Sequence, residues 1–482
     1  MKEGREDAVA TGYTPGGYRE ALQVAWPLII STGSFTLMQF VDRMFLAWHS
    51  STSIQAALPA GILSFTLACG FMALAGYANT FVAQYHGAGD KEGCSRSTAQ
   101  GVWLALLSFP LLLLLIPVGD WILRLSAHPP EVLREELTYF RILMAGSISI
   151  PLNAAISSFF TGRGDTRTNM VAGLVGNVVN IVLDYAWIFG HFGFPALGIA
   201  GAAYATIVAG FVSPLILFAL YFGKTLRRTY NTVATFRFER ELFMRLIRFG
   251  LPSGIQLFLD VSSFSVFVLF TGRMGELALA VSNMAFSINM VAFMPLIGIS
   301  IAASTLVGQY QGRRDAATAE KAGWTCFKIG VLYMTFVAIT YLALPRFYFG
   351  LFMNRAEGGL TMDDVMPLGR YLLAMMAAWG ILDAANLIVS GALKGAGDSR
   401  FVMLYSSIGA WCVLVPVQWA MVRWFNAGIL ASWAWLTIYI MLLSSGFLLR
   451  FRSGAWKSIE VIEQKAPIVP RAPGAESIVL SE

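Results

Sequence analysis

Charged residues are scarce in this chain. Lys, Arg, Asp and Glu make up 13% of the 482 residues, whereas hydrophobic residue types make up 56%. Soluble domains carry about a quarter charged residues. A chain of this length with so little charge cannot cover a soluble surface with polar groups, so the composition excludes a soluble globular protein.

Signals for several other classes are also missing. The four cysteines are scattered without paired spacing, which argues against a disulfide framework and a zinc site. The four histidines are isolated and near loops, so no catalytic triad or metal cluster is indicated. Gly223-Lys224-Thr225 resembles the end of a phosphate-binding loop, but Phe218 stands where the first glycine is required. We therefore expect no enzyme activity and no cofactor, and a membrane-embedded enzyme remains the weaker alternative.

Long apolar runs are what the chain does contain. Runs of about 20 residues recur throughout, each long enough to cross a bilayer as a helix. They are continuous rather than alternating, unlike the strands of a membrane barrel. The sequence thus predicts an all-α polytopic membrane protein with twelve transmembrane helices. The expected spans are 24–48, 56–84, 98–118, 137–160, 169–190, 196–222, 247–272, 277–308, 322–345, 368–393, 401–422 and 427–450.

The loops between these spans differ in charge. One side holds Lys91, Arg96, Arg163, Arg167, the basic set in 224–248, Arg313, Arg314, Lys321, Lys394 and Arg400. The other side holds only Arg124, Arg134, Arg273, Arg346, Arg355 and Arg423. Basic loops favour the cytoplasmic side, so we expect both termini there, in a bacterial plasma (inner) membrane. The net charge of +6 fits this better than nucleic-acid binding. No cleavage site follows the polar residues 1–19, so the first run is expected to be retained.

The chain repeats itself. Val82-Ala83-Gln84-Tyr85-His86-Gly87 resembles Val307-Gly308-Gln309-Tyr310-Gln311-Gly312, and the loop 162–167 resembles 395–400. Six spans, an even number, separate each pair, so the two halves have the same orientation, as in transporters with a parallel repeat. We expect a tail at 1–23, an N-lobe at 24–222, a linker at 223–246, a C-lobe at 247–450 and a tail at 451–482. The residues around Arg240–Arg248 suggest a short interfacial helix.

One apolar span carries a polar stripe. Asn177, Asn180 and Asp184 are spaced so that a helix puts all three on one face. A carboxylate inside the bilayer is costly, by roughly 3 kcal/mol on insertion scales. The stripe indicates a site that faces the protein interior, and the alternative is a helix–helix hydrogen bond that only holds the bundle together.

Three more acids lie within predicted spans: Asp42, Asp260 and Asp383. Each has polar neighbours at helical spacing, Gln39 beside Asp42, Gln256 beside Asp260, and Asn386 beside Asp383. The spans that carry Asp42 and Asp184 are expected to run from inside to outside, and both acids lie late in them. We therefore expect both in the outer half of the first bundle, where Thr206 could add a hydroxyl. Such oxygens suit Na⁺, and a carboxyl in an apolar surround suits a proton equally well.

Together these residues resemble the multidrug and toxic compound extrusion (MATE) family. The resemblance rests on Pro27 with Val41-Asp42, on 180–184 with 188–190, on 198–203 with Thr206, and on the Gly-x-Gly-Asp-x-Arg loops, and it covers roughly residues 20–450. It implies an antiporter that exports cationic or amphipathic organic compounds in exchange for Na⁺ or H⁺ by alternating access. We expect the protein to work as a monomer among membrane lipids. The alternative is a flippase of the same superfamily for a lipid-linked or glycan precursor.

The resemblance also implies roles for single residues. Asp42, Asn180, Asp184 and Thr206 match the ion- or proton-coupling site of one prokaryotic branch, which makes them possible Na⁺ ligands. Asp260 and Asp383 match acidic positions in the second lobe of another branch. With Gln39, Asn177 and Gln256, they form the expected substrate or second-ion site. Arg43 departs from the small polar residue usual after the first acid.

Overall fold

The computed structural model describes residues 14–126, 128–272, 276–353, 361–425 and 428–463. Within these ranges the regular structure is entirely helical, and twelve helical segments are long and apolar enough to cross a membrane. The predicted all-α polytopic fold with twelve spans is therefore confirmed. Arg273 and Arg355, which the sequence assigns to loops, lie outside the described residues.

The described residues of the first half of the chain form ten helices. They are α2 (Tyr18–His49), α3 (Ser51–Gly76), α4 (Ala78–Gly87), α5 (Lys91–Leu114), α6 (Ile116–Leu125), α7 (Pro130–Ala145), α8 (Ser149–Gly162), α9 (Thr166–Phe189), α10 (Ile199–Tyr221) and α11 (Lys224–Tyr230). Two spans are each built from two helices, α3 with α4 and α7 with α8.

The second half includes the longest of the described helices, together with short ones. They are α12 (Arg240–Gly272), α13 (Glu276–Gly312), α14 (Ala316–Ala343), α15 (Pro345–Met353), α16 (Met362–Ala396), α17 (Ser399–Ile408), α18 (Val415–Arg423) and α19 (Ile429–Arg452). A π-helical segment (Gly409–Leu414) joins α17 to α18, and a 3₁₀ turn (Ala455–Ser458) follows α19.

Several helices begin before the apolar runs that predicted them. Asp90, Asp165 and Asp315 each precede a helix and accept a backbone N–H from its first turn. Such caps satisfy donors that the helix itself leaves unpaired. They allow α5, α9 and α14 to start in polar sequence, so the helices project past the bilayer at this end of the molecule. We call it the basic end, because it holds the loops rich in Lys and Arg.

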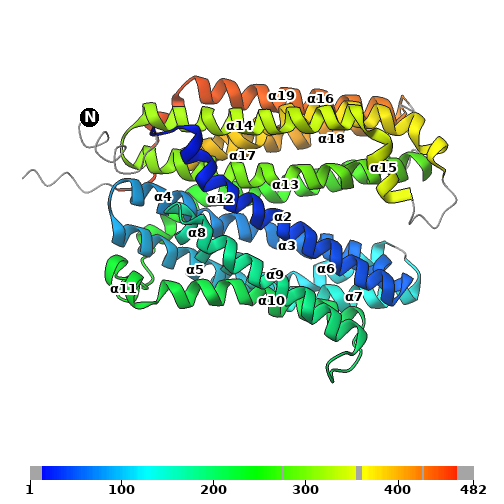
Figure 1. Cartoon of the computed structure of the whole chain (residues 1–482), viewed down its shortest axis with the longest axis horizontal. Helices are drawn as coiled ribbons and strands as arrows, with labels where there is room; N and C mark the ends of the chain where they lie inside the picture. Colours follow the sequence, from blue (N-terminus) through cyan, green and yellow to red (C-terminus); the bar gives the residue numbers. More distant parts are fainter. Residues whose placement is uncertain (1–13, 127, 273–275, 354–360, 426–427, 464–482) are drawn as a thin grey trace, which may run out of the picture.

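The two halves form two bundles that lie side by side (Figure 1). One hydrophobic cluster fills the C-lobe and includes Ala21, Ala25 and Leu28 of α2, so α2 packs against the second half as well as its own. Two further clusters fill the N-lobe, one at the basic end and one at the opposite end. The predicted pair of six-helix lobes is thus confirmed, with α2, α3, α12 and α13 along the seam between them.

The expected interfacial helix in the linker is wrong. The linker instead contains the short α11, and Arg240 is the first residue of the long α12. Leu242, Phe243 and Leu246 are buried in the basic-end cluster of the N-lobe. Of the residues that suggested the interfacial helix, Ile247 is partly buried against this cluster, whereas Arg240, Met244 and Arg248 are exposed.

Both ends of the described chain lie at the basic end (Figure 1). Near the start, the N–H of Gly16 donates to the Tyr310 hydroxyl at the end of α13. After α19, Trp456 stacks on Phe451 with ring centroids 5.1 Å apart, and Val461 lies against Gly397. The first part of the predicted C-terminal tail is therefore packed on the bundle.

Candidate functional site

The structure brings Asp42 and Asp184 together in the N-lobe. α9 carries Asn180 and Asp184 on one face, and their exposed fractions are 1% and 0%. α2 packs against α9 and carries Asp42, whose carboxylate is within electrostatic range of Asp184. Asp42 is half-buried, and two carboxylates within this range repel each other if both are charged. The pair therefore favours a cation or a proton between them.

The polar atoms of this group lack hydrogen-bond partners. Both side-chain atoms of Asn180, both carboxylate oxygens of Asp184 and Oδ1 of Asp42 are buried and unpaired. Buried polar atoms are nearly always paired in folded proteins, and each one left unpaired costs about 1–3 kcal/mol. Four of these five atoms are oxygens, and such a group of unpaired oxygens is typical of a site whose ligand is a small cation or a proton.

Two hydroxyl groups complete the surroundings. Thr206 of α10 donates its hydroxyl to the carbonyl of Ala202 at 2.9 Å, which leaves its oxygen available as an acceptor. Tyr139 of α7 is 5% exposed, and its hydroxyl lies beside Thr206 and within electrostatic range of both carboxylates. The sequence analysis missed Tyr139, because nothing in its local spacing distinguishes it from a packing aromatic.

The donor set determines what this site can hold. Carboxylate, amide and hydroxyl oxygens are ligands for a hard cation such as Na⁺. Among the described residues, no three His, Cys, Asp or Glu side chains are grouped as they would be for a transition metal. The residues present fit Na⁺ or a proton, either of which would satisfy the unpaired oxygens.

The neighbours of this pair have other contacts. Asn177 donates to the Ser34 hydroxyl of α2 at 2.9 Å, so it ties α9 to α2, as the helix–helix alternative for the stripe predicts. Gln39 is half-buried on α2 one turn before Asp42, and Arg43 is exposed. The predicted stripe therefore divides into a part with unpaired polar atoms, Asn180 and Asp184, and a part that packs against α2, Asn177.

Asp260 and Asp383 form a second group in the C-lobe. Asp260 of α12 accepts hydrogen bonds from Ser406 at 2.7 Å and from Gln256 at 3.2 Å. Asp383 of α16 accepts from Asn386 at 3.1 Å and is within electrostatic range of Asp260. Unlike the first pair, these carboxylates are already partly satisfied by protein donors.

A cation accompanies this second group. The sequence analysis assigned Lys394 to a loop, but it lies inside the last turn of α16 and is half-buried. Its ammonium is within electrostatic range of Asp260, and its backbone carbonyl accepts at 3.0 Å from the hydroxyl of Tyr77, which lies between α3 and α4. The C-lobe group therefore contains charges of both signs.

The repeated Gln-Tyr motifs close the seam between the lobes at the basic end. Gln84 of α4 donates to the carbonyl of Gly395 at 3.0 Å, and Gln309 of α13 donates to the carbonyl of Gly162 at 2.8 Å. The two bonds are equivalent under the internal repeat. Both acceptors lie in the last turn of a helix, where carbonyls have no partner within the helix. Each lobe therefore supplies the donor that caps a helix of the other.

Glycines permit the close contact that these bonds need. A Cβ built on Gly87 would lie 1.9 Å from the carbonyl oxygen of Gln309, and one on Gly312 would lie 2.0 Å from that of Gln84. Both distances are far below van der Waals contact. Among the described residues, inter-lobe hydrogen bonds extend from here only to mid-helix, where Thr32 donates to the carbonyl of Met294. The structure is thus sealed at the basic end.

Comparisons with known proteins agree with this architecture. The MatE family model matches residues 27–186 and again 252–420. The starts of the two matched ranges are separated by the same number of residues as Val82 and Val307 of the internal repeat. A probable multidrug resistance protein NorM of Thermotoga maritima is 26% identical over 451 residues, covering 93% of this chain and 95% of that protein. A protein of the same description from Bradyrhizobium diazoefficiens is 28% identical over 453 residues, covering 93% and 96%.

Solved structures show the same fold. A MOP superfamily transporter from Pyrococcus furiosus superposes with a TM-score of 0.81 at 23% identity, covering 92% of this chain and 97% of that one. A multidrug resistance MATE family transporter, described as outward-facing, superposes with a TM-score of 0.79 at 23% identity and covers 91% and 96%.

Proposed function

Because this chain belongs to the multidrug and toxic compound extrusion (MatE) family, a family of membrane transporters and not of enzymes, we propose that it is a secondary antiporter for cationic or amphipathic organic compounds. Entry of Na⁺ or H⁺ drives their export by alternating access. The relatives described as multidrug resistance proteins support this substrate class. We further propose that the chain works as a monomer in the plasma membrane, with the basic end and both termini in the cytoplasm.

The observation that carries the proposal is the group of unpaired oxygens around Asp42 and Asp184. The coupling ion or proton is cargo, and it binds where it satisfies atoms that the protein leaves unsatisfied. Asp42, Asn180 and Asp184 supply most of the oxygens, and Thr206 and Tyr139 complete the set. Since the carboxylates come from α2 and α9, occupancy of the site holds these two helices together.

This arrangement connects ion binding to the lobes. α2 packs on α9 in its own lobe and on α13 of the other lobe, and Pro27 removes a backbone donor from the first part of α2. A change in the contact between α2 and α9 is therefore passed to the seam. In this scheme the sealed basic end corresponds to the outward-facing state, and the C-lobe acids Asp260 and Asp383 attract a cationic substrate.

Efflux from proteoliposomes tests the proposal. Export of a fluorescent organic cation is measured with Na⁺ and H⁺ gradients imposed separately. Asp184→Asn is expected to abolish gradient-driven export, because the amide cannot take up a proton and holds a cation poorly. Asp363→Asn, an exposed acid near the start of α16, is the matched control and should export normally.

Three results would count against this function. Export by Asp184→Asn at the wild-type rate removes the coupling role of this site. An export rate that is the same with and without either ion gradient would exclude antiport. Movement of a lipid-linked precursor, without movement of organic cations, would favour the flippase alternative of the same superfamily.

A further inference from the structure

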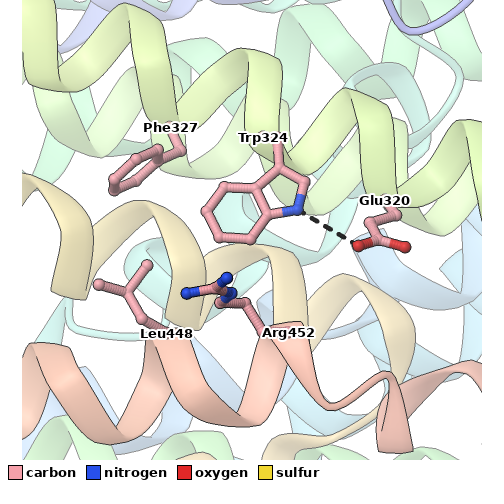
Figure 2. Close-up of a pocket in the computed structure, with 5 residues that line it drawn as sticks. All are labelled: Glu320, Trp324, Phe327, Leu448 and Arg452. Atoms are coloured by element: carbon pink, nitrogen blue, oxygen red, sulfur yellow. Dashed lines mark hydrogen bonds between the residues drawn. The ribbon is translucent and has the colours of Figure 1, made fainter.

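An open groove lies at the basic end, between α14 and α19 and far from both acidic groups. Its volume is about 550 Å³. Figure 2 shows Trp324 and Phe327 of α14 facing Leu448 and Arg452 of α19 across it. A second hollow of about 610 Å³ adjoins it on the other side of Trp324 and is lined by Lys321 and Lys328. Aromatic and aliphatic side chains therefore form the floor, and cations form the rim.

The cations of this groove are not neutralised by the protein. Glu320 is the acid on the rim. It is paired with Lys457 at 2.6 Å and accepts from Trp324 Nε1 at 3.4 Å. Among the described residues, the side chains of Arg452 and Lys328 have no ion pair or hydrogen bond, and both residues are exposed. Lys321 donates only to the carbonyl of Pro15 at 2.9 Å. The groove and the adjoining hollow together therefore carry an excess of positive charge.

The exposed face of α14 continues from this charge into apolar surface. Lys321 and Lys328 are followed on the same helical face by Leu332, Phe336 and Ile339, whose exposed fractions are 73%, 67% and 59%. α14 is one of the twelve membrane-spanning helices, so this apolar stripe faces lipid. The surface offers cations first and hydrocarbon contact next, in the order in which a phospholipid presents its phosphate and its acyl chains.

We propose that this groove binds the headgroup of an anionic phospholipid between α14 and α19, with an acyl chain along the apolar stripe of α14. Arg452 in the groove and Lys328 in the adjoining hollow attract the phosphate from the two sides of Trp324. Trp324 packs at the boundary between headgroup and chain, where indole rings are favoured. A dissolved anion would use the cations alone and gain nothing from the stripe. This lipid site is separate from the coupling site and does not depend on the proposed transport function.

Native mass spectrometry of the full-length protein in detergent tests the site, with phosphatidylglycerol and phosphatidylcholine as the probes. The wild type should retain phosphatidylglycerol in preference. The variant Lys328→Gln/Arg452→Gln should bind it about 30-fold more weakly, since each cation near an anionic lipid contributes about fivefold. Arg227→Gln/Arg228→Gln is the matched control. It removes two exposed charges from α11, at the same end of the molecule, and should bind like the wild type.

A second measurement locates the lipid and needs only a conservative change. Phosphatidylglycerol brominated in the acyl chains near the headgroup should quench part of the tryptophan fluorescence, and Trp324→Phe should remove that part. The proposal is overturned if the double variant keeps its lipid, if the control loses as much, or if Trp324→Phe leaves the quenching unchanged. Displacement of the lipid by excess glycerol phosphate would overturn it too, since that would show a site for free anions.

Discussion

Removing one of the two reciprocal glutamine bonds should shift the equilibrium between the sealed basic end and the state in which it opens. Leucine at position 309 is close to glutamine in volume but cannot donate to the carbonyl of Gly162. A buried acceptor left without a donor costs about 1–3 kcal/mol. If the bond exists only in the sealed state, the ratio of open to sealed molecules rises by roughly 5- to 150-fold.

The internal repeat makes this prediction sharper. Gln84→Leu removes the equivalent bond to Gly395, so the two single variants should shift the equilibrium by similar amounts. The bonds lie on opposite sides of the same seam, so the double variant should shift it further. Gln311→Leu is the matched control, because Gln311 donates to the carbonyl of Lys457 within the second half of the chain.

Distances between spin labels measure the effect. Lys91 and Arg400 are exposed at the basic ends of opposite lobes and are suitable positions for labelled cysteines in a background without the native ones. Gln84→Leu and Gln309→Leu should each broaden the distance distribution toward longer values, and Gln311→Leu should not. Unchanged distributions in Gln84→Leu and Gln309→Leu, or the same broadening in all three, would refute the reasoning.

Three further predictions concern the coupling site and the seam. Asn180→Leu replaces two unpaired buried polar atoms with hydrocarbon. It should therefore raise the free energy of unfolding in ion-free detergent by about 1–3 kcal/mol. A lower melting temperature would contradict this. Tyr139→Phe should raise the ion concentration that gives half-maximal export by about fivefold, the effect of one lost hydrogen bond. The maximal export rate should change little. An unchanged ion dependence would exclude the hydroxyl from the site. Gly312→Ala should abolish export, because its Cβ would meet Gln84, whereas Gly350→Ala in α15 should export normally. Wild-type export by Gly312→Ala would show that the close approach is not needed.

The fold was largely predictable from local sequence. Twelve apolar runs, the loop charges and the duplicated motifs depend on composition and on short spacing, and each of these is set within one helix or one loop. Asn180 and Asp184 could be assigned to one buried face for the same reason, since helical geometry alone fixes their relation. The helix ends were less predictable, because acids such as Asp165 and Asp315 extend helices into polar sequence by capping them.

The linker shows where local pattern is ambiguous. The apolar face of 240–248 is compatible with a membrane surface and with a protein surface, and periodicity does not distinguish the two. The structure buries Leu242 and Leu246 against the N-lobe and leaves Met244 exposed, so only the tertiary contacts show which side of this segment meets protein. Lys394 is a similar case, since a lysine near a predicted span end is ordinarily a loop residue and here lies beside Asp260.

Contacts between distant segments came from the tertiary structure alone. Tyr139 lies near Asp42, Asp184 and Thr206 because α7 packs against α10. The residues next to Tyr139 in the sequence do not indicate this contact. The sequence shows that the Gln-Tyr and Gly-x-Gly-Asp motifs are each duplicated, but not that each Gln bonds the last turn of a helix in the other lobe. Composition and helical periodicity thus determined what each segment is. Which segments meet depended on side-chain packing across hundreds of residues, which no short-range pattern encodes.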